Sequence, residues 1–356
     1  MTAPARRDVP LADLTTLRLG GPARTLVAPA TEDDLIAAVR AADAAGTPLL
    51  LLAGGSNLVI ADAGFDGTAV HVATRGIEAV AADPDRVELT VAAGEPWDGV
   101  VAHCVAEGLV GVECLSGIPG STGATPIQNV GAYGQEVAQT IVRLRAYDRA
   151  EDRVVTLDAA DCGFAYRTSA FKGRDRHVVL SVTFGLRRGA ESAPIAYAEL
   201  ARTLGIAVGD AAPLADVRAA VLGLRRGKGM VLDPTDRDTY SAGSFFTNPI
   251  LDEAGFAALA ARVHARLGPD ATPPRFPAPD GQAKTSAAWL IERAGFAKGH
   301  ARGPVALSSK HTLALTNRGG ATTADLLGLA REIRDGVREA FGVTLVNEPV
   351  LVGVAL

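Results

Sequence analysis

Four glycines and two prolines are concentrated in residues 118–134, whose sequence is IPGSTGATPIQNVGAYG. This composition fits neither a regular helix nor a regular strand, so it predicts a loop. Because glycine can adopt positive φ and lets backbone amides come close to a ligand, such a loop can surround phosphate groups with N–H donors. A second glycine turn, GGSN at residues 54–57, directly follows the apolar run 48–53, which is predicted to be a buried strand. Together the two loops predict a site for a nucleotide cofactor.

Neither loop carries one of the common nucleotide-binding fingerprints. No Walker lysine follows the glycines of residues 54–57. Residues 118–134 lack the order of strand, G-x-G-x-x-G and helix that defines a dinucleotide-binding turn. The kind of nucleotide therefore has to be inferred from the other motifs of the chain.

Three further motifs accompany the loops: YRTSAFK at 166–172, GSFFTNP at 243–249 and EPV at 348–350. With GGSN and the extended loop IPGSTGATPIQNVGAYGQE at 118–136, they occur in the order that is typical of the UDP-N-acetylenolpyruvoylglucosamine reductases, the MurB family. The chain resembles that family from Leu14 to its C-terminus. The resemblance implies a flavoenzyme that uses FAD and NADPH to reduce the enolpyruvyl group of UDP-N-acetylglucosamine enolpyruvate, giving UDP-N-acetylmuramate for peptidoglycan synthesis.

The predicted elements favour an α+β fold, because helices and strands alternate without the strict βαβ rhythm of a doubly wound sheet. The resemblance implies a two-lobed FAD-binding module of the vanillyl-alcohol-oxidase (PCMH-like) type and a third, α+β substrate-binding domain. The expected domains are lobe 1 at 1–74 with the terminal strand 343–356 returning to it, lobe 2 at 75–228 and the substrate-binding domain at 229–342. A break is predicted at 227–233. Periodicity predicts helices at 31–46, 97–106, 213–226, 252–267, 285–294 and 323–341, and strands at 69–72, 87–91, 141–147, 154–157, 178–186 and 343–354.

Reduction of an enolpyruvyl ether needs a hydride donor, a group that stabilises the resulting enolate, and a proton donor on the opposite face. The resemblance assigns enolate stabilisation to Arg167 and Glu348 and protonation to Ser244. A guanidinium suits the first task through charge-assisted hydrogen bonds, whereas a serine hydroxyl depends on the site for its acidity. Outside their motifs, these residues would be interpreted as a surface ion pair, an ordinary strand carboxylate and a turn or cap hydroxyl.

The resemblance also implies two sets of binding residues. The cofactor set combines glycines and small side chains that allow close packing on a pyrophosphate: Gly54, Gly55, Ser56, Asn57, Ile118, Pro119, Gly120, Ser121, Gly123, Ala124, Gln128, Asn129, Gly131 and Ala132. The substrate set offers cations and hydrogen-bond donors for a UDP-sugar: Tyr197, Lys228, Asn248 and Lys284. Tyr197 indicates the subtype of the family whose tyrosine closes over the substrate. For Lys228 a structural alternative is open, since a cation at a helix C-terminus also complements the helix dipole.

Bulk properties limit the partners. The net charge of −5 without a long basic run argues against nucleic-acid binding. Three cysteines with no C-x-x-C favour a reducing compartment, and the scattered histidines argue against a metal site. No signal peptide or membrane-spanning segment is evident, so we expect a cytoplasmic protein. The absence of an apolar seam favours a monomer that binds small molecules only.

Two alternatives stay open at this point. One is an FAD oxidase or dehydrogenase of the wider vanillyl-alcohol-oxidase-like fold, although such enzymes lack GSFFTNP and the terminal EPV. The other is a flavin- or UDP-sugar-binding protein that has lost catalysis, which the retention of Arg167, Ser244 and Glu348 disfavours.

Overall fold

The computed structural model describes residues 4–356, which form two compact units built from separated stretches of chain. The first unit comprises the residues up to Pro10, Pro22–Gly55 and Phe65–Val231. The second comprises Leu11–Gly21, Ser56–Gly64 and Leu232–Leu356. The chain leaves the first unit after Val231, inside the break predicted at 227–233. The three expected domains, 1–74, 75–228 and 229–342, remain a prediction.

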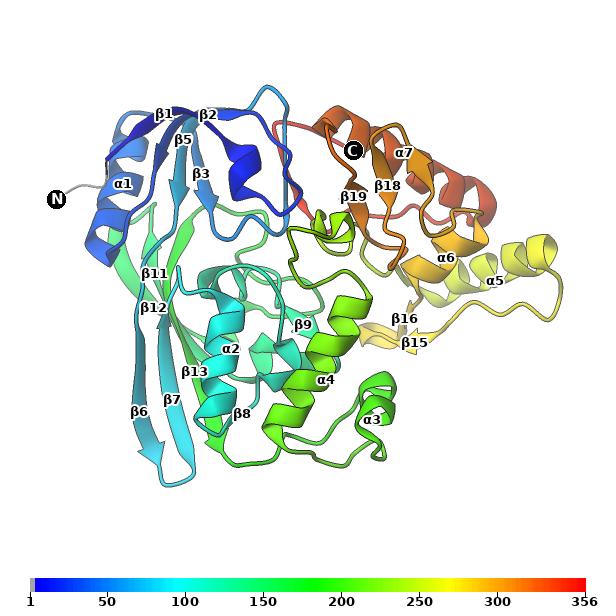
Figure 1. The fold of residues 1–356 in the computed structure, drawn as a ribbon, viewed down its shortest axis with the longest axis horizontal. Helices are drawn as coiled ribbons and strands as arrows, with labels where there is room; N and C mark the ends of the chain where they lie inside the picture. Colours follow the sequence, from blue (N-terminus) through cyan, green and yellow to red (C-terminus); the bar gives the residue numbers. More distant parts are fainter. Residues whose placement is uncertain (1–3) are drawn as a thin grey trace. The chain divides into compact units, whose positions relative to one another are not determined.

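A four-stranded sheet with the order β1-β2-β5-β3 opens the first unit (Figure 1). Its strands are β1 (Arg6–Pro10), β2 (Pro22–Val27), β3 (Leu49–Leu52) and β5 (Phe65–His71). Helix α1 (Glu32–Ala44) begins after Thr31, whose hydroxyl accepts a hydrogen bond from the Asp34 amide, and it buries Leu35 and Val39. The helix predicted at 31–46 and the strand predicted at 48–53 are therefore confirmed. Of β3, however, only Leu52 is fully buried, so the prediction of a buried strand overstates its burial.

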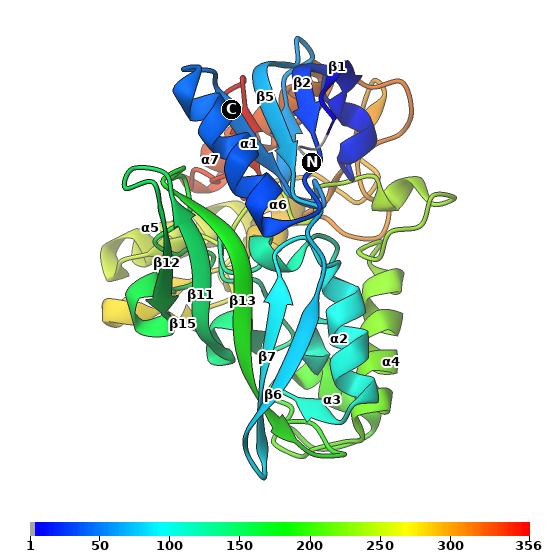
Figure 2. The same ribbon diagram turned by 90° about the vertical axis from the view of Figure 1, so that its left-hand side faces the viewer.

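The second sheet of this unit is antiparallel and has six strands, five of which follow the order β12-β11-β13-β7-β6 (Figure 2). The strands are β6 (Ile77–Asp83), β7 (Arg86–Ala92), β8 (Leu109–Val110), β11 (Ile141–Asp148), β12 (Arg153–Asp158) and β13 (His177–Arg188). Four of them were predicted from the alternation of apolar residues. Strand β6 was not, because all of its residues are exposed and it lies at the edge of the sheet, where no buried face imposes a pattern.

Three helices complete the first unit: α2 (Trp97–Ala106), α3 (Ala198–Leu204) and α4 (Leu214–Gly227). Helix α2 matches its prediction to the residue, and Trp97 packs against Phe184 of β13 with a ring separation of 5.6 Å. Helices α3 and α4 share a small apolar core that includes Leu200 and Val217. This core fixes the C-terminal end of α4, which Lys228 follows, and the N-terminal end of α3, which Tyr197 precedes.

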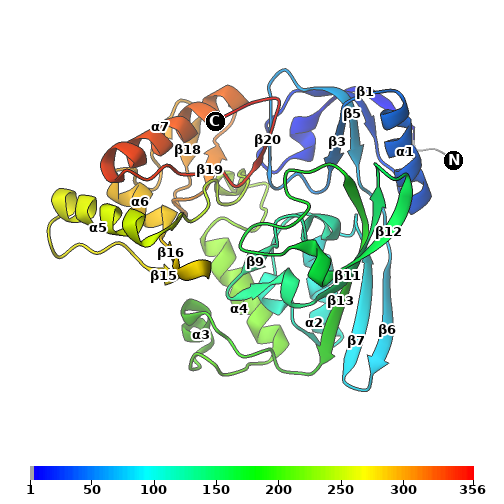
Figure 3. The same cartoon turned by 180° about the vertical axis from the view of Figure 1, so that it is seen from behind.

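The second unit is built from helices around short strands (Figure 3). The helices are α5 (Glu253–Leu267), α6 (Ala287–Arg293) and α7 (Thr323–Phe341). The strands are β14 (Ile250–Leu251), β15 (Phe276–Pro277), β16 (Ala283–Lys284), β17 (Ala301–Arg302), β18 (Val305–Leu307), β19 (Leu315–Asn317), and the parallel pair β4 (Leu58–Ile60) and β20 (Val350–Val352). Helix α7 lies beside β18 and β19 and buries a stripe that includes Leu326, Ile333 and Phe341.

The predicted α+β class is confirmed, because antiparallel sheets and helices are combined without a doubly wound parallel sheet. The predicted terminal strand 343–354 is wrong in its length. Only Val350–Val352 form strand β20, and Glu348 lies in the irregular segment before it. A proline at position 349 has no N–H for a strand ladder, which explains why the strand begins after it.

Candidate active site

The two glycine loops that the sequence singles out meet inside the first unit. A methyl group placed on Gly54 would lie 2.6 Å from the Cα atom of Gly120, so only glycine allows this approach. The longer loop lies along residues 93–97: the Gly123 amide donates to the Ala93 carbonyl at 2.8 Å, and Gly120 accepts from the Trp97 amide at 3.0 Å. The prediction that both loops serve one ligand is consistent with this contact.

Four backbone amides where the loops meet find no acceptor among residues 4–356. Among residues 4–356, the amides of Gly54, Gly55, Gly120 and Ser121 donate no hydrogen bond, and Gly55 and Ser121 are buried. Buried backbone donors are nearly always satisfied, so these amides indicate a bound acceptor. A pyrophosphate such as that of FAD offers the oxygen atoms they need. The residues present therefore fit the implied cofactor.

The other members of the predicted cofactor set divide between the units. Ile118, Pro119, Gly123, Ala124, Gln128, Asn129, Gly131 and Ala132 lie along the longer loop in the first unit. Ser56 and Asn57 belong to the second unit, where the Asn57 carbonyl accepts from the Val350 amide at 2.9 Å and its Nδ2 donates to the Glu348 carbonyl at 3.4 Å. The GGSN turn is thus shared between the two units.

The segment that carries Arg167 is fastened onto the longer loop. The Arg167 guanidinium donates to the carbonyl of Gly131 at 2.7 Å and to that of Asn129 at 3.4 Å. The Ser169 hydroxyl donates to the Ile127 carbonyl at 2.6 Å, and Lys172 Nζ donates to the Arg167 carbonyl at 2.8 Å. Arg167 itself has φ +53°, a strained conformation for a residue with a side chain. The structure therefore brings Arg167 to the cofactor loop.

Tyr197 and Lys228 also come together, with Tyr133 from the end of the loop. The rings of Tyr133 and Tyr197 stack edge to face at 5.5 Å, and Lys228 Nζ lies 5.5 Å from the Tyr133 ring centroid. Lys228 also pairs with Glu199 at 2.6 Å. Burial opposes its charged form, but the hydrogen bond to Glu199 and nearby tyrosines keep the Lys228 pKa above its usual value. Lys228 is therefore positively charged at neutral pH.

In the second unit, Ser244 and Glu348 are joined through one residue. The Phe245 carbonyl accepts from the Glu348 amide at 2.9 Å, and the Phe245 amide donates to the Leu313 carbonyl at 2.7 Å. Gly243 has φ +73°, which allows the turn just before Ser244, and Phe245 is buried. The half-buried hydroxyl of Ser244 is thereby held on a rigid turn.

Asn248 and Lys284 flank the same part of the second unit. Asn248 Oδ1 accepts from the Ala287 amide at 3.0 Å, at the start of α6, and Lys284 pairs with Ile250 across β14 and β16. The oxygen of Asn248 thus has a structural role, and its Nδ2 group donates no hydrogen bond within residues 4–356. That amide group is therefore available to a further hydrogen-bond acceptor.

Sequence reasoning missed the partners of these residues. Glu199 follows Tyr197 by two positions, and only its pairing with Lys228 in space reveals its importance. Glu136 ends the loop motif and accepts from Asn129 Nδ2 at 2.8 Å. No pattern in the sequence indicates either contact, because both join segments brought together by the fold.

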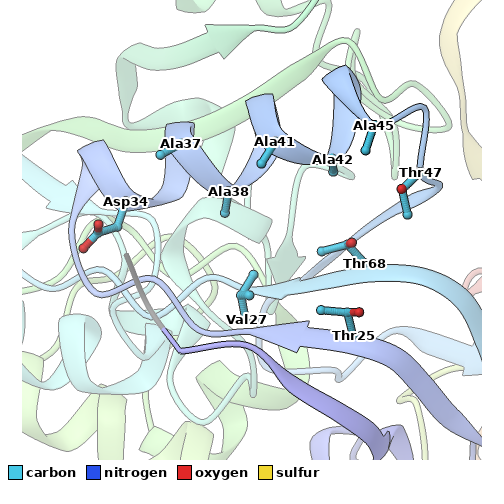
Figure 4. A pocket seen from close by; sticks show the side chains of 10 residues that line it. All are labelled: Thr25, Val27, Asp34, Ala37, Ala38, Ala41, Ala42, Ala45, Thr47 and Thr68. Atoms are coloured by element: carbon cyan, nitrogen blue, oxygen red, sulfur yellow. The ribbon is translucent and has the colours of Figure 1, made fainter. Parts of the chain in front are cut away.

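Other features do not belong to this chemistry. Burial raises the pKa of Cys104 and of Cys114 to about 12, so neither thiol is a nucleophile at neutral pH. A cavity of about 260 Å³ lies between α1, β2 and β5, lined by alanines of the helix and by threonines such as Thr25 and Thr68 (Figure 4). It contains none of the predicted site residues.

No helix within residues 4–356 has the length and apolar character to cross a lipid bilayer. No group of three or more His, Cys, Asp and Glu side chains there is arranged to hold a metal ion.

The fold and the paired loops define the class of the protein. A family model described as an FAD binding domain matches residues 23–158, which include Gly54 to Asn57 and the longer glycine loop. A second, described as the C-terminal domain of UDP-N-acetylenolpyruvoylglucosamine reductase, matches residues 233–352, which include Ser244 and Glu348. The protein is an FAD-binding oxidoreductase.

Full-length relatives identify the family. A UDP-N-acetylenolpyruvoylglucosamine reductase of Thermobifida fusca is 63% identical over 356 residues, covering 100% of both chains. One of Streptomyces coelicolor is 62% identical over 98% of this chain and 90% of its own length. The crystal structure of the Thermus caldophilus enzyme (MurB) shares the fold, with a TM-score of 0.65 at 23% identity over 99% of each chain. The chain belongs to the UDP-N-acetylenolpyruvoylglucosamine reductase family.

The contact between the glycine loops gives a first prediction. In Gly54→Ala, the added methyl would force Gly120 away, and overpacking of this kind costs about 1–3 kcal/mol. We expect FAD affinity to fall about 5- to 150-fold, measured by titrating the apoprotein with FAD. As a control, Gly223→Ala adds a methyl on α4 with nothing within 4 Å. Equal FAD affinity in Gly54→Ala and the control would contradict the role of this contact.

Proposed function

We propose that this protein catalyses the NADPH-dependent, FAD-mediated reduction of the enolpyruvyl group of UDP-N-acetylglucosamine enolpyruvate to UDP-N-acetylmuramate. The observation that carries this is the hydrogen bond from the Glu348 amide to the Phe245 carbonyl, because it ties the turn of Ser244 to the segment of Glu348. This is the pairing of a proton donor and an enolate-stabilising carboxylate that the reaction needs. The reaction serves peptidoglycan synthesis, and thereby cell-wall biogenesis, cell shape and cell division, in the cytoplasm.

FAD, when bound and reduced by NADPH, supplies the hydride from its N5 atom. Arg167 stabilises the negative charge that develops on the substrate carboxylate, since a guanidinium donates charge-assisted hydrogen bonds. Glu348 works with it on the enolate. Ser244 then donates its proton to the carbanion centre, and the turn around it fixes the backbone position from which the hydroxyl projects. These roles belong to side chains that the two units hold in fixed local geometry.

The charged diphosphate and sugar of the substrate need their own contacts. Lys228 is positively charged and borders the Tyr133–Tyr197 pair, so it provides a cation for the diphosphate. Tyr197 is 44% exposed and can move over a bound substrate. Asn248 and Lys284 supply an amide donor and a second cation. The protein acts as a monomer in this proposal.

Anaerobic visible absorbance tests the function. Purified holoprotein is mixed with NADPH, and UDP-N-acetylglucosamine enolpyruvate is added afterwards. We expect NADPH to bleach the bound flavin and the enolpyruvyl substrate to restore its absorbance. A flavin that is bleached but is reoxidised only by oxygen would instead support an oxidase. Retention of oxidised absorbance with NADPH would rule out NADPH as the reductant.

Lys228 gives a prediction for substrate binding. In Lys228→Met the stem is kept but the charge is lost, and a hydrogen bond to a charged group contributes about 1.5–3 kcal/mol. We expect KM for the UDP substrate to rise about 10- to 100-fold with kcat little changed. Steady-state kinetics with Arg226→Met, an exposed cation on the same helix end, provides the control. A similar rise in KM for both variants would point to a general charge effect.

A further inference from the structure

Asn129 was assigned to the cofactor from the sequence, yet its polar groups are engaged within the protein. Its Nδ2 donates to Glu136 Oε2 at 2.8 Å and to the Ala165 carbonyl at 3.2 Å, and its Oδ1 accepts from the Ala138 amide at 3.1 Å. The residue is only 1% exposed. The backbone carbonyl of Asn129 accepts a hydrogen bond from the Arg167 guanidinium. The side chain of Asn129 thus joins three segments of the first unit.

These contacts hold Arg167 both near its backbone and at its guanidinium group. Ala165, which Asn129 holds, lies two residues before Arg167, and the guanidinium of Arg167 returns to the carbonyls of Asn129 and Gly131. Asn129 and Arg167 both have positive φ, at +46° and +53°. Such conformations persist only where surrounding contacts fix them. The loop and the Arg167 segment therefore hold each other in a strained geometry.

Glu136 in turn holds the side chain of Asn129 in place. Its carboxylate accepts from Asn129 Nδ2, and its own amide donates to Gln139 Oε1 at 3.0 Å. A methyl group on Gly131 would lie 2.8 Å from Glu136 Cγ and 3.1 Å from Arg167 Nη1. The side chains of Glu136 and Arg167 therefore pack against the same side of Gly131. A shift of Glu136 would free the side chain of Asn129 and would open space beside the guanidinium of Arg167.

We propose that Asn129 and Glu136 form a positioning pair, which fixes the guanidinium of Arg167 for enolate stabilisation and does not itself touch the substrate. This rests on the proposed role of Arg167. Small displacements of a charge-stabilising group cost large factors in rate, whereas binding of the remote diphosphate is unaffected. Loss of the pair should thus appear in kcat for the enolpyruvyl substrate and not in its KM.

The test separates the two half-reactions in stopped flow. In Glu136→Ala and in Asn129→Asp, we expect reduction of the flavin by NADPH to keep its wild-type rate, since it does not depend on Arg167. Reoxidation by UDP-N-acetylglucosamine enolpyruvate should slow about 10- to 100-fold. Glu136→Gln retains an oxygen acceptor for Asn129 Nδ2 and should therefore keep most of the wild-type reoxidation rate. Glu107→Ala, an exposed carboxylate at the end of α2, serves as the control.

A double-mutant cycle with Arg167→Ala decides whether the pair acts through the guanidinium. If it does, Glu136→Ala should cost less than about threefold further in the Arg167→Ala background. Equal costs in both backgrounds would overturn the proposal, and so would slowed flavin reduction, which would show general damage to the cofactor loop. Wild-type reoxidation in both Glu136→Ala and Asn129→Asp would also overturn it. Should the wild-type enzyme itself not be reoxidised by the substrate, the proposed function fails instead, which the same traces reveal.

Discussion

Ser244→Ala should retain FAD, be reduced by NADPH at the wild-type rate, and lose about 10²- to 10⁴-fold in turnover of the enolpyruvyl substrate. That is the range for removing a general acid from a reaction that needs a proton at one carbon atom. The substitution removes only the hydroxyl, because Gly243 and the Phe245 backbone bonds shape the turn. Single-turnover absorbance of the reduced flavin measures the effect.

A hydroxyl elsewhere in the second unit provides the comparison. Thr344→Ala removes an exposed hydroxyl four residues before Glu348, and it should leave turnover unchanged. Solvent deuterium should slow the wild-type enzyme and have a smaller effect on residual turnover of Ser244→Ala, where proton delivery no longer uses the serine. Turnover of Ser244→Ala at the level of Thr344→Ala would remove the proton-donor role.

The long helices could be predicted because their signals are local. For α7, Thr322 caps the first turn, a stripe including Leu326 and Ile333 recurs at helical spacing, and Gly342 with φ +72° ends the helix. Strand β6 offered no such signal, since Ile77 and Val80 are exposed. Its position follows from pairing with β7, an interaction that is not encoded in a periodic pattern.

The same distinction between local signals and long-range contacts applies to the candidate site. Residue type alone reveals the glycine loops, because a Cβ atom at Gly54 would collide with Gly120. Residue type does not reveal which donors Glu136 and Glu199 satisfy, since their partners depend on how distant segments pack. The sequence therefore predicted the residues proposed to meet the ligand, but it did not reveal that Asn129, Glu136 and Glu199 hold neighbouring side chains in place.

Arg167→Lys should lower kcat/KM for the enolpyruvyl substrate about 10²- to 10³-fold, the usual cost of removing one donor from a charge-stabilising site. Lysine keeps the positive charge but has a single nitrogen. It cannot donate to the carbonyls of Gly131 and Asn129 and also present a planar pair of donors to the substrate carboxylate. The loss should therefore arise from geometry, although the net charge is unchanged.

The measurement that separates geometry from charge compares Arg167→Lys with Arg174→Lys, an exposed arginine seven residues further along the chain. Arg174→Lys should behave as wild type. Reduction by NADPH should be normal in both, so the deficit of Arg167→Lys should lie entirely in reoxidation by the substrate. Near-wild-type reoxidation in Arg167→Lys would mean that a point charge is sufficient, and that the hydrogen bonds to Gly131 and Asn129 hold the loop without orienting the guanidinium for catalysis.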